Sequence, residues 1–197
     1  MKIIIATHNK HKVTEFRRIL EPLGFDVLSQ TEAGIDIEIV EDGTTFRENA
    51  EKKARAVSNA GKCIAIADDS GICIDAFDGA PGIYSARFLG EDTPYIEKNA
   101  IILDRLKEVA DKDRTARYVC AICCIFPNGD VINTEGICEG KMGYIAKGAN
   151  GFGYDPIFFV GDKSMAELSD NEKDEISHRG VALRKFVIEL KKYLDKK

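Results

Sequence analysis

The stretch Cys63-Ile64-Ala65-Ile66-Ala67-Asp68-Asp69-Ser70-Gly71 decides the class of fold. Its first five residues are apolar without a break, which is typical of a strand buried on both faces of a parallel sheet. Two carboxylates and a Ser-Gly pair follow at once, and residues 72–76 then predict another strand. Ligands in α/β folds bind in loops at the ends of such strands. The stretch therefore predicts an α/β fold with an acidic loop at a binding site.

The remaining elements alternate at first between strands and helices. Short apolar runs predict further strands at residues 2–7, 25–28, 116–126, 130–139 and 157–160. Apolar residues at helical spacing predict helices at residues 10–21, 45–60, 94–110 and about 170–194. In the last helix the predicted buried stripe is Leu183, Phe186, Val187, Leu190 and Leu194. Because a Pro-Asn-Gly hairpin turn at 127–129 interrupts the alternation, we predict an α/β fold with a mixed sheet flanked by helices.

The chain has 197 residues and a formal net charge of −5. This length allows one large domain or two small lobes. The acidity argues against a nonspecific grip on nucleic acid, although a local basic cleft can still hold a polyphosphate. No apolar run approaches the ~20 residues of a membrane helix, and we interpret residues 1–7 as a buried first strand rather than a signal peptide. We therefore expect a cytoplasmic protein whose partners include neither nucleic acid nor a membrane.

The six cysteines all lie in or beside apolar stretches, at Cys63, Cys73, Cys120, Cys123, Cys124 and Cys138. This is not the loop-rich pattern of a disulfide-stapled secreted domain. Cys120 and Cys123 form a CxxC, but a structural zinc site needs a second pair, and a redox CxxC favours the start of a helix. We interpret the cysteines as buried free thiols that serve as small apolar residues. A redox or metal protein built on Cys120, Cys123 and Cys124 stays open as an alternative.

The polar loop Thr7-His8-Asn9-Lys10-His11-Lys12 joins the first predicted strand to the first predicted helix. Backbone N–H groups at the start of a helix, together with the helix dipole, favour anions. The lysines add positive charge, and Thr7 and Asn9 add hydrogen bonds. The loop therefore suits phosphate. It is not a GxxxxGK[ST] P-loop, however, and the same residues also fit a simple helix cap with solvated lysines.

Asp68 and Asp69 suit a hard cation such as Mg²⁺, which prefers carboxylate oxygens and substrate phosphates. Because neighbouring side chains of an extended strand point to opposite sides, we expect only one of the pair to face an ion directly. An Asp turn or an exposed strand end is the alternative interpretation. Further acids gather near the start of the helix at 45–60, where they also fit a helix cap: Glu38, Glu41, Asp42 and Glu48.

Two more polar stretches complete the candidate site. Residues 148–155 combine glycines with Phe152, which can stack on a base, and Asp155, which can accept a hydrogen bond. The run Ser177-His178-Arg179 lies near Lys173 in the C-terminal helical region and suits a planar polar ligand. A plain loop and a surface histidine are the alternatives, and no GxSxG elbow supports a serine hydrolase. Together the clusters predict a site for a magnesium-bound nucleotide.

Five stretches, in order, resemble the inosine triphosphate pyrophosphatase family, whose bacterial and archaeal members are called dITP/XTP pyrophosphatases. They span the chain from Lys2 to about Lys191: ATHNKHKVTEF at 6–16, TTFRENAEKKA at 44–54, IADDSGICIDAFDGAPGIYSARFLGED at 66–92, GFGYDPIFF at 151–159 and MAELSDNEKDEISHRGVAL at 165–183. The resemblance implies magnesium-dependent hydrolysis of ITP, dITP or XTP to the monophosphate and pyrophosphate. It also implies an elongated mixed sheet in a single domain of residues 1–197, with two lobes and a central cleft, in a homodimer.

The resemblance further implies a role for each matching residue. Asp69, the second aspartate of its motif, would accept a proton and bind magnesium, and Ser70 would touch the substrate. The triphosphate would be held by the loop residues Thr7, His8, Asn9, Lys10, His11 and Lys12. The remaining residues would contact the nucleotide, largely its base: Phe152, Gly153, Tyr154, Asp155, Lys173, His178 and Arg179.

One stretch departs from the family pattern. Many relatives carry two acids before a Gly-x-Thr-Phe stretch, whereas this chain has Val40-Glu41-Asp42-Gly43. Val40 would then occupy the position often credited with metal binding, and we take Glu41 as the substitute ligand. His8 and His11 also vary within a loop that otherwise fits. Two rival functions stay open: a nucleotide- or RNA-binding protein without catalysis, and a pyrophosphatase for other modified bases such as methylated pyrimidines.

Overall fold

The computed structural model describes residues 1–196, which contain one open sheet of seven strands. In sheet order the strands are β2 (Asp26–Ser29), β1 (Lys2–Ile5), β3 (Ala65–Ile74), β4 (Thr115–Ile125), β5 (Val131–Met142), β6 (Phe158–Val160) and β7 (Lys163–Ser164). β1 runs parallel to β2 and β3, whereas β6 runs antiparallel to β5 and β7. The predicted α/β fold with a mixed sheet is therefore confirmed.

Five α-helices accompany the sheet within the described residues: α1 (Lys10–Leu20), α2 (Phe46–Gly61), α3 (Tyr95–Arg105), α4 (Asp170–Ile176) and α5 (His178–Leu194). The starts of α1, α2 and α4 follow local capping signals. The side chain of Asn9 caps α1, and Thr45 caps α2 by accepting a hydrogen bond from the Glu48 N–H. The Glu48 carboxylate in turn accepts hydrogen bonds from the backbone N–H and hydroxyl of Thr44.

Three predictions about these elements are wrong. β3 is one strand that runs through Asp68 and Asp69, and no loop divides it into two. The C-terminal helical region is also divided, because Ser177 is extended between α4 and α5. Leu194, expected in the buried stripe, is 43% exposed because it is the last residue of α5, one turn beyond the buried Leu190.

The chain divides into two compact units. The first unit comprises Met1–Asp69, Cys120–Gly136 and the C-terminal segment from His178. The second unit comprises Ser70–Val119 and Ile137–Ser177. β3, β4 and β5 each contribute residues to both units, and the predicted site residues are divided between the two units.

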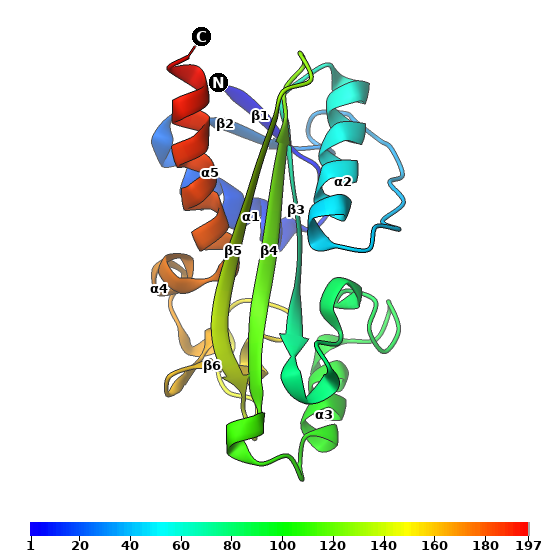
Figure 1. Cartoon of the computed structure of the whole chain (residues 1–197), viewed down its shortest axis with the longest axis vertical. Helices are drawn as coiled ribbons and strands as arrows, with labels where there is room; N and C mark the ends of the chain where they lie inside the picture. Colours follow the sequence, from blue (N-terminus) through cyan, green and yellow to red (C-terminus); the bar gives the residue numbers. More distant parts are fainter. Residues whose placement is uncertain (197) are drawn as a thin grey trace. The chain divides into compact units, whose positions relative to one another are not determined.

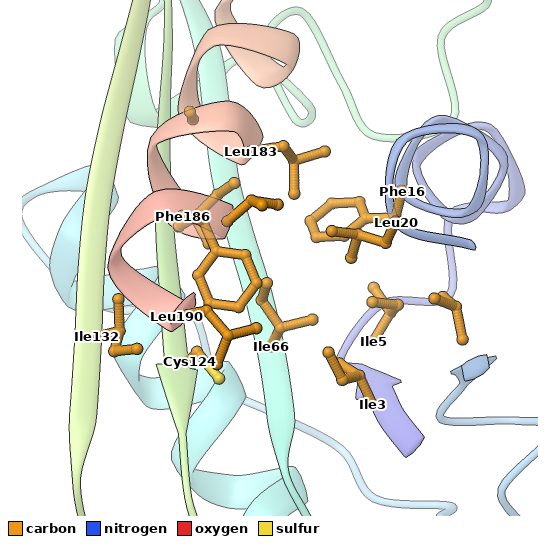
Figure 2. Close-up of a cluster of buried hydrophobic side chains, with 14 of the residues drawn as sticks. Ile3, Ile5, Phe16, Leu20, Ile66, Cys124, Ile132, Leu183, Phe186 and Leu190 are labelled. Atoms are coloured by element: carbon orange, nitrogen blue, oxygen red, sulfur yellow. The ribbon is translucent and has the colours of Figure 1, made fainter. Parts of the chain in front are cut away.

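In the first unit, helices cover both faces of the sheet, with α1 and α5 on one side and α2 on the other (Figure 1). Figure 2 shows the buried side chains on the α1 and α5 side pointing toward one another: Ile3, Ile5, Phe16, Leu20, Ile66, Cys124, Ile132, Leu183, Phe186 and Leu190. The opposite face packs on α2 through Ile4, Ala50, Ala54, Val57, Ala65 and Ala67. Consecutive residues of β1 and β3 therefore alternate between the two faces.

The second unit has a core of its own. Its buried side chains come mainly from β3, α3 and the strands that follow: Ile72, Ile74, Ile102, Leu106, Tyr118, Cys138, Met142, Ile157, Phe158 and Met165. Tyr118 and Phe158 meet edge-on, with ring centroids 4.8 Å apart. The fully buried guanidinium of Arg114 donates hydrogen bonds to the carbonyls of Leu106 and Met142, which ties the start of β4 to the end of α3 and of β5.

All six cysteines are free thiols, and Cys120, Cys123, Cys124 and Cys138 are buried as predicted, whereas Cys63 and Cys73 are only half-buried. Cys120 and Cys124 belong to the cluster under α1 and α5, whereas Cys123 packs on the α2 side. The CxxC cysteines thus point to opposite faces. Burial raises the pKa of the Cys123 thiol to about 12, which keeps it protonated and unreactive. These features argue against the redox alternative.

Within residues 1–196, no helix combines the length and the apolar character that a membrane crossing needs.

Candidate active site

The two aspartates of β3 lie on opposite faces of the sheet, as the period of a strand requires. Asp68 turns toward α1 and α5, where Lys12 and Arg179 contact it. Asp69 turns toward α2, where Asn49 and Lys53 contact it. Both carboxylates are buried, with residue exposures of 1% for Asp68 and 7% for Asp69. Buried acids are costly unless they are paired, so these partners explain how the strand continues through the pair.

Asp68 is held in its ionised form by two cations. Nε and Nη2 of Arg179 donate to Asp68 Oδ2 at 3.1 and 2.8 Å, and Nζ of Lys12 lies 3.1 Å from the same oxygen. Burial alone would raise the pKa of Asp68, but the charges of Arg179 and Lys12 outweigh it and hold that pKa well below its usual range. Asp68 is therefore a permanent anion inside the first unit.

The groups around Asp69 shift its pKa in the opposite direction from that of Asp68. Asn49 Nδ2 donates to Asp69 Oδ2 at 3.1 Å, and Lys53 Nζ lies 3.4 Å from Oδ1. Burial raises the pKa of Asp69 above its usual value, although the charges of Lys53 and Lys12 oppose that effect. Neighbouring carboxylates whose pKa values are pushed apart are suited to different chemical roles. Asp69 is the member of the pair that is better able to accept a proton.

Glu41 joins the Asp69 side of the site through Lys53. The Lys53 ammonium lies 2.8 Å from Glu41 Oε2 and 3.4 Å from Asp69 Oδ1, so the two carboxylates converge on one cation. Within residues 1–196 there is no group of three or more His, Cys, Asp or Glu side chains that could hold a metal ion by themselves. Two convergent carboxylates are the donor set that Mg²⁺ uses when substrate phosphates and water supply its remaining ligands.

The loop before α1 is both a helix cap and a support for Lys12. Asn9 Oδ1 accepts hydrogen bonds from the N–H groups of His11 and Lys12 at 3.0 and 3.3 Å. Thr7 Oγ1 accepts one from the Asn9 N–H at 3.2 Å. Asn9 is therefore the cap of α1, as the cap interpretation predicts, but Lys12 is not a solvated lysine, because its side chain reaches the buried Asp68.

The other residues of this loop lie toward solvent. Lys10 and His11 are exposed at the start of α1. The ring of His8 contacts Gln30 Nε2 at 2.8 Å and Thr31 Oγ1 at 3.4 Å, which links the loop to the end of β2. The structure thus brings Lys12 to the aspartates and leaves Lys10 and His11 at the surface of the first unit.

The second unit gathers most of the residues expected around the base. Asp155 Oδ2 accepts hydrogen bonds from the Phe152 N–H at 2.9 Å and from Lys173 Nζ at 2.8 Å. The Lys173 ammonium also lies 4.9 Å from the centroid of the Phe152 ring. The Gly153 carbonyl accepts a hydrogen bond from Asn99 at 3.1 Å. Asp155 and Lys173 are buried, so they fix the position of Phe152, which is only half-buried.

Tyr154 and the glycine loop before it also have close structural contacts in the second unit. The Tyr154 hydroxyl donates to the Ser85 carbonyl at 2.7 Å, and the Tyr154 ring meets Tyr95 edge-on. Gly151 has a positive φ of 77°, and a Cβ there would lie 2.2 Å from Asp155 Oδ2, so only glycine allows this close approach.

Ser70 follows Asp69 on β3 and is half-buried.

The break between α4 and α5 positions His178 and Arg179 at the start of a helix. Gly136 of β5 permits this, because a Cβ there would lie 2.1 Å from the His178 carbonyl oxygen. His178 is 5% exposed and Arg179 is 2% exposed. Besides its two hydrogen bonds to Asp68, Arg179 directs Nη1 to the carboxylate of Glu15 on α1. At least three of its N–H groups are therefore engaged by carboxylates of the first unit.

The sequence as a whole matches one protein family. The model of the Ham1 family matches residues 3–189.

The chain belongs to the Ham1 family.

This Ham1 chain is similar to two proteins that are named dITP/XTP pyrophosphatase. One, from an Exiguobacterium species, is 48% identical over 193 residues, covering 96% of this chain and 97% of its own. The other, from Bacillus subtilis, is 50% identical over 188 residues, covering 93% of both. The solved structure of the Staphylococcus aureus Ham1 protein superposes with a TM-score of 0.86 at 37% identity, covering 98% of this chain and 100% of that one. The Coxiella burnetii Ham1 protein gives 0.87 at 37% identity, covering 98% and 99%.

Sequence reasoning missed three side chains that contact the two aspartates or Arg179 in this Ham1 chain: Glu15, Asn49 and Lys53. Helical spacing carries a signal for each of them. Asn49 and Lys53 are four positions apart on α2, on the face that packs over β3 near Asp69. Glu15 follows Lys12 by three positions on α1, so both reach toward Asp68 and its partner Arg179. The spacing indicates these contacts only once the two helices are known to pack on β3.

Proposed function

We propose that this Ham1 protein hydrolyses the non-standard purine nucleoside triphosphates ITP, dITP and XTP to the monophosphate and pyrophosphate. This reaction removes such nucleotides from the pool before they enter DNA or RNA. The observation that carries the proposal is the pair of neighbouring buried carboxylates on opposite faces of β3, whose pKa values are shifted in opposite directions and which lie beside the ammonium groups of Lys12 and Lys53. The names of the relatives at 48% and 50% identity support the same activity.

The proposed step is attack of water on the α-phosphorus. A new bond forms between the water oxygen and the α-phosphorus, and the bond to the oxygen that bridges to the β-phosphorus breaks, so that pyrophosphate leaves. Asp69 accepts the proton of the water, a role that its raised pKa favours. Lys12 and Lys10, with the positive end of the α1 dipole, bind the triphosphate and offset charge on the leaving group.

We also propose that the activity depends on Mg²⁺. Asp69 and Glu41 would hold the ion, because their carboxylates already converge on the Lys53 ammonium. When bound there, the ion would neutralise charge on the phosphate oxygens. This chain has Val40 at the position where the family pattern has an acid. Glu41, the next residue, contacts Lys53 and so lies on the Asp69 side of the site.

For the base, we propose that Phe152 stacks on the purine while Asp155 and Lys173 hold the Phe152 segment in place. The 6-oxo group of hypoxanthine and xanthine accepts a hydrogen bond that the 6-amino group of adenine cannot accept. A donor that faces this position, for which His178 is the candidate, would therefore bind the 6-oxo purines better than adenine, a mismatch that supports discrimination of up to ~10⁴-fold. We propose that Arg179 contributes less to the base than the sequence predicts, because carboxylates of the first unit engage it.

A cytoplasmic location and a homodimer are further parts of the proposal. Six free cysteines, none in a disulfide, fit a reducing compartment. The homodimer follows from the family resemblance, and sedimentation of the purified protein tests it.

A substrate panel tests the proposed function directly. With Mg²⁺, we expect pyrophosphate from ITP, dITP and XTP at rates at least ~10²-fold above that for ATP, and no orthophosphate. With EDTA in place of Mg²⁺, release should fall to background. Equal rates with ATP and ITP would contradict the base recognition. Orthophosphate as the first product would contradict attack at the α-phosphorus, and a preference for methylated pyrimidine nucleotides would favour the rival pyrophosphatase.

A further inference from the structure

Four charged side chains in the first unit form a series of contacts that begins and ends on α1, so that the α1 backbone closes it into a ring. Lys12 Nζ lies 3.1 Å from Asp68 Oδ2, and Asp68 Oδ2 accepts hydrogen bonds from Arg179 Nε and Nη2 at 3.1 and 2.8 Å. Arg179 Nη1 in turn donates to the carboxylate of Glu15, three positions after Lys12 on α1. The ring joins α1, β3 and α5, and two cations balance two anions within it.

Because these four side chains have little contact with solvent, a change in the charge of one strongly affects the other three. The side chains of Asp68, Arg179 and Glu15 are 0%, 2% and 7% exposed, whereas that of Lys12 is 15% exposed. Charges in so dry a setting interact far more strongly than charges in water. Lys12 is therefore the one member of the ring with appreciable contact with solvent, and the other three determine where its ammonium lies.

We propose that Glu15 is a positioning residue that acts through Arg179 and Asp68 on Lys12. Asp68 Oδ2 is shared between the guanidinium and the ammonium. Glu15 engages the opposite side of the guanidinium, so it takes up part of the Arg179 charge and leaves Asp68 able to bind Lys12. With a neutral residue at position 15, Arg179 interacts more strongly with Asp68. Asp68 then binds the Lys12 ammonium less strongly, and the ammonium moves from its position.

The consequence falls on turnover more than on substrate affinity. Charge on the leaving pyrophosphate increases in the transition state, so a correctly placed ammonium contributes more there than in the ground state. This inference rests on the proposed function, in which Lys12 faces the triphosphate. It adds Glu15, which has no place in the phosphate loop or the acidic motif, to the residues on which catalysis depends.

The test is the kinetics of Glu15→Gln with ITP and Mg²⁺. We expect kcat to fall ~10-fold or more while KM changes less than ~3-fold. The matched control is Glu51→Gln, which removes the charge from an exposed Glu-Arg pair on α2 (Glu51 with Arg55) and should leave both constants within ~2-fold. A normal kcat for Glu15→Gln would overturn the inference.

A double-mutant cycle with Lys12→Met separates positioning from a general structural effect. In the Lys12→Met background, Glu15→Gln should lower kcat less than ~2-fold further, because the group it positions is gone. A full ~10-fold further loss would show that Glu15 does not act through Lys12 and would overturn the inference. If Glu15→Gln does not fold, the same cycle is made with Glu15→Asp, which keeps the charge but shortens its reach, with the same two readings.

Failure of the inference and failure of the proposed function give different results. Wild-type protein that releases no pyrophosphate from any purine triphosphate contradicts the function. The positioning of Lys12 is then measured by calorimetric titration with pyrophosphate and Mg²⁺. Glu15→Gln should weaken that binding at least ~3-fold, with no further loss in the Lys12→Met background. Unchanged pyrophosphate affinity for Glu15→Gln would overturn the inference on its own.

Discussion

Asp69→Asn should lower the rate of pyrophosphate release from ITP by about 10³-fold, while the protein stays folded. The amide has the shape of the carboxylate but neither accepts the proton of the attacking water nor holds a cation as strongly. Burial raises the pKa of Asp69, which means that the fold disfavours its charge. A neutral side chain at this position should therefore cost little stability. The measurement is steady-state release of pyrophosphate together with thermal unfolding.

Asp68→Asn is the matched control, because it makes the same chemical change at the adjacent residue. The pKa of Asp68 is held well below its usual range by Arg179 and Lys12, so the fold favours this charge. Its loss leaves Arg179 without its main partner inside the first unit and should lower the unfolding temperature clearly more than Asp69→Asn does. Wild-type turnover by Asp69→Asn, or a larger loss of stability at residue 69 than at 68, would contradict the assignment of the two roles.

Arg179→Met should lower the free energy of unfolding by about 3–5 kcal/mol, the usual effect of removing one partner from a buried ion pair. The change keeps much of the apolar stem but leaves Asp68 and Glu15 buried without the guanidinium between them. The measurement is denaturant unfolding at pH 7. The control is Arg55→Met, which breaks the exposed pair with Glu51 and should cost less than about 1 kcal/mol.

The same variant separates two roles for Arg179. If Arg179 mainly positions Asp68 and Lys12, Arg179→Met loses stability and turns over ITP and ATP in nearly the wild-type ratio. If Arg179 mainly recognises the base, stability changes little and the ratio of ITP to ATP turnover falls. The second result would contradict the role that the burial of Arg179 indicates.

Much of the fold could be predicted from local patterns. The apolar run before Asp68 predicted the first part of β3, and the spacing of Val13, Phe16 and Leu20 predicted the buried face of α1. The path of β3 through the aspartates could not be predicted, because it depends on distant charges. Arg179, which neutralises Asp68, lies 111 positions further along the chain. An isolated Asp-Asp-Ser-Gly favours a polar loop until such partners are known.

The site was partly predictable for the same reason. The alternation of a strand correctly indicated that Asp68 and Asp69 point to opposite sides. Which of the two is neutralised depends on α5 and α1 on one face and on α2 on the other, and no local pattern reveals that assignment. Glu15 and Lys53 were missed because single charged residues inside amphipathic helices are ordinarily solvated.

The most direct test of the account is a crystal structure of the Asp69→Asn variant with ITP and Mg²⁺. We expect the phosphate oxygens to lie within hydrogen-bond distance, about 3 Å, of the Lys12 ammonium, with the α-phosphorus beside residue 69. A triphosphate bound away from both Lys12 and residue 69 would contradict it.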